Sequence, residues 1–98
     1  MNRMMAIEKL QEQTDALRGM GATGLYLFGS TARGEASPTS DLDLFIDHEQ
    51  NGRFSLIELA GMQQLLEETM DVRIDLTTRN SLHPALKTGI ESSAVRIF

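Results

Sequence analysis

Apolar residues recur along this chain with two periods, one typical of helices and one typical of strands. From Ile7 to Leu17 they return every three or four positions among charged and amide residues, which predicts an amphipathic helix over residues 2–18. Gly19 and Gly21 follow this segment and are expected to end the helix.

A second helix is predicted over residues 55–69. Ser55 and Glu58 stand at the spacing of a capping box, in which each side chain bonds a backbone N–H at the start of the helix. Apolar residues then recur from Leu56 to Met70 at helical spacing and form a broad face. A helix with one such face is expected to cover a sheet.

The last part of the chain predicts a third helix and an apolar ending. This helix spans residues 82–91, with Asn80 or Ser81 as its cap. Pro84 falls in its first turn, where the missing N–H costs no helical hydrogen bond. Residues 94–98 are either a short last strand or an apolar plug against the sheet.

Three segments have the composition or the alternation that is typical of strands. Residues 25–28 are a short apolar run between glycines, and residues 41–46 and 72–77 alternate apolar with polar side chains. In the second segment Asp41 and Asp43 fall on one face, because strand side chains alternate. The polar faces of the second and third strands are expected to share the open side of the sheet.

The order of these elements predicts an α/β (α+β) fold. A small mixed sheet of three to four strands would be covered, mainly on one face, by about three helices. The chain has 98 residues, so residues 1–98 are expected to form a single domain. Its 41% hydrophobic and 23% charged residues are typical of a globular protein.

Charge and composition narrow the choice of partners. Nine basic against fourteen acidic residues give a net charge of −5, and no run of Lys or Arg forms the positive stripe that extensive nucleic-acid binding needs. Cysteine is absent, which excludes a disulfide framework and a thiolate metal site. The sequence has neither a stretch of about 18 apolar residues nor a signal-peptide core. A cytoplasmic protein without membrane contact is therefore expected.

Three aspartates are the candidate metal ligands. Asp41 and Asp43 point the same way from one predicted strand, with their Cα atoms about 7 Å apart. Carboxylates this close raise each other's cost of ionisation unless a cation lies between them. Mg²⁺ prefers oxygen ligands and usually takes one or two carboxylates together with phosphate oxygens and water. Asp75 would join the pair if its strand is a neighbour in register.

A turn after the first predicted strand has the features of a phosphate-binding turn. Gly29 lets the backbone approach a ligand closely, and the amides that follow and the Ser30 hydroxyl can donate hydrogen bonds to phosphate oxygens. Arg33 can add a charge-assisted contact. Only the loop of residues 35–40 separates this turn from the aspartate pair, so phosphate donors and metal ligands are expected to converge.

Simpler roles compete with the catalytic one. Two aspartates two positions apart are most often a solvated strand face. Asp75 alone could be an edge-strand charge or a partner for Arg73. Arg33 could form a surface ion pair with Glu35, an interaction that contributes little.

Two further features are expected to have structural roles. Residues 19–24 match the dinucleotide-binding pattern of glycines, but that pattern must follow a strand and open a helix, and here it follows a helix and opens a strand. His83, beside Pro84, is expected to pack or cap at the start of a helix rather than take part in chemistry. His48 lies in a polar loop with no evident companion ligand.

Together, the turn and the aspartates resemble a known signature. Residues 29–44, from the glycine-serine turn to the Asp-x-Asp pair, resemble the motif of the DNA polymerase beta-like nucleotidyltransferases, and Asp75 fits the position of their third aspartate. The chain most resembles the minimal nucleotidyltransferases, the MNT group, including the stretch Leu82–Leu86 and the apolar ending. The resemblance covers nearly the whole length and implies the nucleotidyltransferase fold.

The resemblance also implies a role for each of these residues. The aspartate pair would hold two Mg²⁺ ions, and Asp75 would complete the site that activates the acceptor oxygen. Gly29, Ser30 and Arg33 would bind the triphosphate of ATP. Attack on the α-phosphorus would release pyrophosphate, with two metals stabilising the entering and the leaving oxygen.

A partner protein is implied as well. Minimal members often accompany a HEPN-domain toxin, a helical ribonuclease, and neutralise it, some by placing AMP on a toxin tyrosine. ATP-dependent transfer of AMP to such a toxin is therefore the first functional prediction. A binding module that blocks the toxin by occlusion is the alternative. Nucleotidylation of a small molecule or of RNA ranks third, because the sequence shows neither an acceptor domain nor a basic face.

Overall fold

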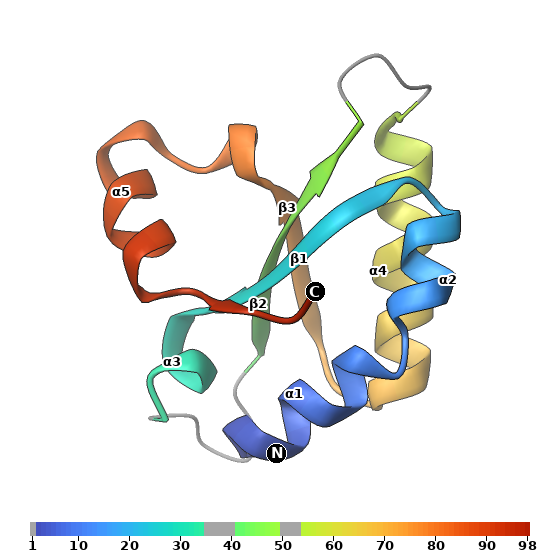
Figure 1. The fold of residues 1–98 in the computed structure, drawn as a ribbon, viewed down its shortest axis with the longest axis horizontal. Coiled ribbons are helices and arrows are strands. Elements are labelled where there is room, and N and C mark those ends of the chain that lie inside the picture. The colour runs from blue at the N-terminus through green and yellow to red at the C-terminus, as the bar shows by residue number, and fades with distance from the viewer. Residues whose placement is uncertain (1, 35–40, 50–53) are drawn as a thin grey trace.

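Four strands form one mixed sheet in the order β3-β2-β1-β4 (Figure 1). The computed structural model describes residues 2–34, 41–49 and 54–98. The strands are β1 (Ala22–Phe28), β2 (Leu42–His48), β3 (Ile74–Thr78) and β4 (Val95–Arg96). β2 runs parallel to β3, while β1 is antiparallel to both β2 and β4. The mixed α/β sheet predicted from the sequence is confirmed.

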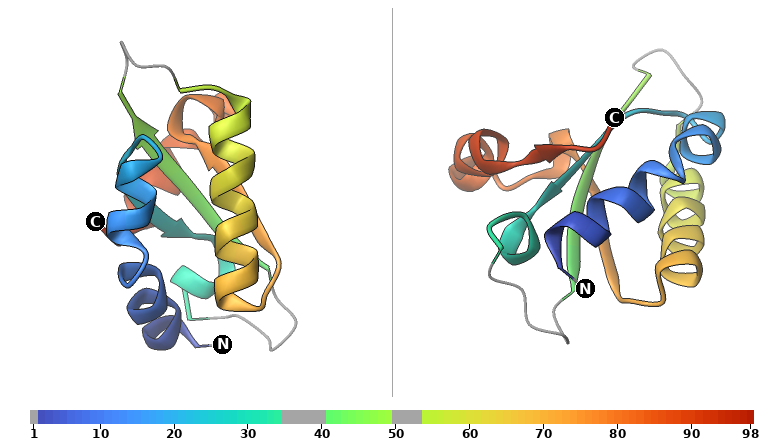
Figure 2. Two further views of the ribbon diagram at one scale, coloured as in Figure 1. Left: turned by 90° about the vertical axis from the view of Figure 1, so that its right-hand side faces the viewer. Right: turned by 60° about the horizontal axis from the view of Figure 1, so that its bottom comes forward.

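Helices cover the two faces of this sheet unequally (Figures 1 and 2). In the described ranges they are α1 (Arg3–Gln11), α2 (Thr14–Gly19), α3 (Gly29–Ala32), α4 (Leu56–Met70), α5 (Pro84–Ser93) and the 3-10 helix η1 (Arg79–Ser81). α1, α2 and α4 lie on one face, α5 lies on the other, and α3 is a single turn at the end of β1. No helix in the described part of the chain is long and apolar enough to cross a membrane.

The hydrophobic core lies between the sheet and the face formed by α1, α2 and α4. Leu25 and Leu27 of β1 and Leu44 and Ile46 of β2 are fully buried there, since alternate strand residues point to the same side. Burying each such side chain contributes roughly 1.5–3 kcal/mol. α5, in contrast, has no buried residue. The expectation of one well-covered face is therefore confirmed.

The first helix is broken, and the prediction of a single helix over residues 2–18 is wrong. α1 ends at Gln11 and α2 begins at Thr14. The Thr14 hydroxyl donates a 2.7 Å hydrogen bond to the Gln11 carbonyl, and the Gln13 N–H bonds the Leu10 carbonyl at 3.0 Å. Short-range bonds of this kind compete with the helical pattern and turn the chain. The turn leaves Leu10 and Leu17 both fully buried.

The later helices start much as the sequence indicates. α4 has the complete capping box of Ser55 and Glu58. α5 begins two residues later than predicted, because residues 79–81 form η1, and its cap is His83 rather than Asn80 or Ser81. The His83 side chain accepts a 3.1 Å hydrogen bond from the Ala85 N–H, which confirms the capping role expected for this histidine.

The apolar ending takes both of the forms considered for it. Val95 and Arg96 pair with β1 as strand β4, and Ile97 is buried at 5% exposure in the core. Leu25 exchanges backbone hydrogen bonds with the residues that follow β4. The last residues therefore close the free edge of β1 and fill the core beneath it.

Arg79 ties α5 to the second face of the sheet. Its Nε and Nη2 atoms donate to the two Asp47 carboxylate oxygens at 2.7 and 3.0 Å, and Nη1 donates to Glu91 at 2.6 Å. The guanidinium carbon lies 4.8 and 5.0 Å from the ring centres of Tyr26 and Phe45. These ionic hydrogen bonds raise the pKa of Arg79, so the clamp stays charged at any physiological pH.

Candidate active site

The turn after β1 is shaped by a glycine that lies against an aspartate. Gly29 has a φ of +75°, a conformation that L side chains rarely adopt. A Cβ added there would overlap the Asp43 carboxylate and lie 3.1 Å from its carbon atom. The first residue of α3 therefore has to be a glycine, and the predicted phosphate turn is in direct contact with the predicted metal site.

Strand pairing brings two of the three aspartates next to each other. Asp43 is the register partner of Asp75 in the parallel pair β2–β3, and of Phe28 in the antiparallel pair β1–β2. Neighbouring strands lie about 4.8 Å apart. Asp41 precedes β2 and is exposed. The condition set for Asp75, that its strand be a neighbour in register, is met.

Electrostatics at Asp43 show a local excess of negative charge. Burial raises the pKa of this carboxyl above its ordinary value of 3.8, and the charges of Asp75 and Asp41 raise it further. The positive charge of Arg33 acts in the opposite direction. A cation beside Asp43 would relieve this repulsion, which is the electrostatic condition for a metal-binding carboxylate.

The carboxylates are neighbours but do not surround a single point. Among the described residues, no group of three or more His, Cys, Asp and Glu side chains is arranged to hold a metal ion. The donor set nevertheless suits Mg²⁺, which commonly takes only one or two carboxylates and completes its shell with phosphate and water. Metal binding by Asp41, Asp43 and Asp75 therefore stays a prediction that strand register and charge support.

Two hollows flank the site. One of about 220 Å³ lies on the β3 side and includes Asp41, Asp75 and Glu67 of α4 in its lining. The other, of about 350 Å³, lies on the β1 side beside Gly29 and Arg33. Glu67 was not predicted from the sequence, because nothing in the pattern of α4 separates it from the other polar residues of that helix. Its carboxylate accepts a 3.2 Å hydrogen bond from the Ile74 N–H at the start of β3.

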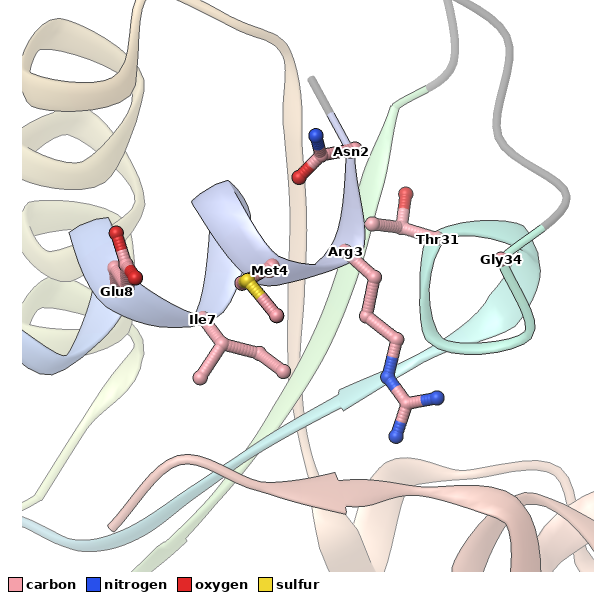
Figure 3. A pocket seen from close by; sticks show the side chains of 7 residues that line it. All are labelled: Asn2, Arg3, Met4, Ile7, Glu8, Thr31 and Gly34. Carbon is pink, nitrogen blue, oxygen red and sulfur yellow. The ribbon is translucent and has the colours of Figure 1, made fainter.

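A larger hollow lies away from the aspartates, where α1 passes α3 (Figure 3). Its volume is about 750 Å³, and Met4, Ile7 and Thr31 contribute to its lining. Thr31 is 1% exposed, and its hydroxyl has no hydrogen-bond partner in the described structure. The described residues that line this hollow include the carboxylate of Glu8 but neither Gly29 nor Asp43, so size alone does not identify the reactive site.

The structure bears on several of the simpler roles considered for single residues. Within the described ranges no ion pair joins Asp75 to Arg73. The pairing of Arg33 with Glu35 lies outside the described residues. Gly19 is the last residue of α2, Gly21 lies in the turn that follows, and Gly24 lies within β1. This glycine pattern therefore follows a helix and opens a strand, as expected, and does not have the context of a dinucleotide site. His48 ends β2 and stacks on Phe54 with ring centres 4.3 Å apart, away from any ligand set.

Comparison with known proteins agrees with this arrangement. The nucleotidyltransferase domain family matches the chain over residues 7–97, a span that contains the turn and all three aspartates. The chain belongs to this family. As a nucleotidyltransferase it is 38% identical, over 74 residues, to a Methanocaldococcus jannaschii protein assigned as a protein adenylyltransferase, with 74% of each chain covered.

Solved structures place this nucleotidyltransferase among the minimal members. A protein assigned as a minimal nucleotidyltransferase superposes with a TM-score of 0.74 at 31% identity, covering 97% of this chain and 95% of the other. The MNT antitoxin complexed with the tri-AMPylated HEPN toxin of Shewanella oneidensis gives a structural match with a TM-score of 0.64 at 19% identity, covering 90% and 68%. The second likeness is one of fold alone. The resemblance read from the sequence is confirmed.

Proposed function

We propose that this nucleotidyltransferase transfers AMP from ATP to a tyrosine of a HEPN-domain toxin and thereby acts as its antitoxin in the cytoplasm. Two findings support the proposal. The Methanocaldococcus jannaschii relative is assigned as a protein adenylyltransferase. In the Shewanella oneidensis complex, the protein that shares this fold is an antitoxin bound to a toxin that carries AMP groups.

One observation within the chain supports the chemistry above all. Asp43 contacts the Gly29 turn on one side and is the register partner of Asp75 on the other. A triphosphate bound at the turn would therefore have its α-phosphorus beside carboxylates. An acceptor hydroxyl that approaches over β3 would meet Asp75.

The residues of the turn and the three aspartates have separate roles in an in-line displacement at the α-phosphorus. The backbone amides after Gly29 and the Ser30 hydroxyl donate hydrogen bonds to the triphosphate, and Arg33 adds positive charge. Asp41, Asp43 and Asp75 would hold Mg²⁺, which when bound stabilises negative charge on the entering and leaving oxygens. The acceptor oxygen forms a bond to the α-phosphorus, and the bond to pyrophosphate breaks. The acceptor proton leaves to solvent from a hydroxyl oriented by Asp75.

The experiment is a transfer assay with the cognate toxin. The purified protein, a candidate HEPN-domain toxin, ATP and MgCl₂ are incubated together, and the toxin mass is measured with and without EDTA. We expect an increase of one or more AMP masses on a tyrosine, only in the presence of magnesium. A toxin that stays unmodified while it is neutralised would contradict the catalytic proposal.

The double variant Asp41→Asn, Asp43→Asn separates catalysis from occlusion. These changes keep side-chain size but remove the negative charge that a cation needs. We expect complex formation with the toxin to persist while AMP transfer falls at least about 100-fold, corresponding to several kcal/mol of lost charge stabilisation. Full neutralisation of the toxin by this variant would instead favour a binding module.

A further inference from the structure

We propose that the apolar hollow beside Gly29 holds the purine base of the nucleoside triphosphate. This inference rests on the proposed function and names the part of the site that recognises the base. The hollow has a volume of about 350 Å³ and lies between β1, α3 and α5. Phe28, Leu86 and Ile90 give it apolar walls, and Gly29 connects it to the phosphate turn.

One stripe of α5 faces this hollow. Leu86, Gly89, Ile90 and Ser93 all line it, and their spacing of three and four residues puts them on the same side of a helix. Leu86 remains 60% exposed, and α5 has no buried residue. This apolar stripe is therefore not used up in packing against the protein's own core, and it points to the space next to the phosphate turn.

Gly89 lines the hollow and adds no side chain to it. It lies inside α5, where glycine is among the least favourable residues for helix stability. Outside its own stretch of helix, a Cβ at this position would meet no atom of the described residues within 4 Å, so none of these residues requires a glycine there. Because Gly89 lines the hollow, we expect a side chain there to extend into it, which would give this helix-weakening residue a function in admitting a ligand.

The strand order indicates which substrate uses this space. Asp75 on β3 and Phe28 on β1 lie on opposite sides of Asp43. If the acceptor approaches over Asp75, the β1 side is left to the nucleotide. Phosphates need N–H and O–H donors, which in this lining come from Arg33, next to the turn, and from Ser93. The faces of a base instead pack well on aromatic and aliphatic side chains such as Phe28, Leu86 and Ile90. The phosphates therefore bind at the turn and the base enters the hollow.

Calorimetric binding of two probes, MgATP and magnesium tripolyphosphate, tests this assignment. Gly89→Leu places a side chain in the hollow and is expected to weaken ATP binding at least tenfold, while tripolyphosphate affinity changes less than twofold. Thr88→Leu adds the same side chain to an exposed position of α5 that does not line the hollow. This control should bind both probes like the unmodified protein.

The outcomes separate the subsite from the proposed function. Unchanged ATP affinity in Gly89→Leu, with ATP bound normally by the unmodified protein, overturns the base subsite and leaves the transferase intact. If Gly89→Leu binds ATP normally but transfers AMP to the toxin poorly, the hollow holds the aromatic ring of the acceptor tyrosine. This result also overturns the base subsite. An unmodified protein that binds neither probe contradicts the transferase itself. Equal weakening of ATP and tripolyphosphate shows damage to the turn and refutes the base assignment.

Discussion

Asp43 is the residue at which stability and the proposed function oppose each other. Burial, and then the charges of Asp75 and Asp41, raise its pKa above 3.8. The folded state therefore binds the proton more tightly than the unfolded state. The stability that this group contributes is complete below pH 3.8 and declines as pH rises through the raised folded-state pKa. Without metal, the ionised carboxylate destabilises the fold at neutral pH.

Replacement of this aspartate should therefore stabilise the metal-free protein. We expect Asp43→Asn to melt at a higher temperature than the unmodified protein at pH 7 in EDTA, with the difference shrinking as pH is lowered toward 4. Thermal melts between pH 4 and 8 measure this. Added MgCl₂ and ATP should stabilise only the protein that retains Asp43. A lower melting temperature for the variant at pH 7 would refute the electrostatic account.

Gly29 and Gly34 form a matched pair for testing the turn. Both have positive φ, +75° and +74°, but only at Gly29 would a Cβ meet Asp43, while at Gly34 it meets no atom of the described residues within 4 Å. Gly34→Ala should lower the free energy of unfolding by about 1–2 kcal/mol, the cost of the left-handed conformation. Gly29→Ala should cost more and should disturb Asp43 as well.

Denaturant unfolding of both alanine variants measures the difference between these glycines. Addition of Asp43→Ala to Gly29→Ala should recover part of the loss, because it removes the carboxylate that collides with the new Cβ. Equal costs at the two positions would mean that the turn does not press on the aspartate.

At the scale of elements, η1, β2 and α5 are held together by one side chain. Arg79 joins Asp47 of β2 to Glu91 of α5 and lies over two aromatic rings. Because α5 buries no residue, this clamp is a principal restraint on its position. The same helix forms a wall of the hollow beside Gly29, so its attachment affects the candidate nucleotide site.

Arg79→Lys should loosen α5 although it preserves the charge. A lysine cannot make the paired hydrogen bonds to Asp47, so we expect a loss of about 1–2 kcal/mol in unfolding free energy and faster amide exchange in α5. A double-mutant cycle with Asp47→Ala measures the coupling. Additive effects of the two changes would show that the paired hydrogen bonds between Arg79 and Asp47 contribute nothing to stability.

At the scale of the whole molecule, the last residues of the chain complete the sheet, because β4 pairs with β1, the first strand in the sequence. Ile97 is 5% exposed in the core. Leu56, an aliphatic residue of the same size, is 81% exposed at the start of α4 and serves as the control. We expect Ile97→Ala to cost about 2–4 kcal/mol in urea unfolding and Leu56→Ala less than about 0.5 kcal/mol. Similar costs would mean that the tail does not close the sheet in solution.

Much of the fold could be predicted because its signals are local. The capping box at Ser55, the alternation around Asp43 and the apolar run before Gly29 each depend on neighbours in the sequence. The break at residues 12–13 was missed, because a side-chain hydrogen bond from Thr14 overrides a helical period that continues through it. The start of α5 was misplaced because His83, not Asn80 or Ser81, caps it.

The sequence by itself determined which residues are the candidates for the chemistry, since a glycine-serine turn, an Asp-x-Asp pair and a later aspartate form a specific motif. Only the tertiary structure decided how they meet. Strand pairing set Asp43 between Phe28 and Asp75, and the packing of α5 across the sheet created the hollow lined by Gly89. These relations depend on contacts between segments far apart in the chain, and no local pattern of residues encodes such distances.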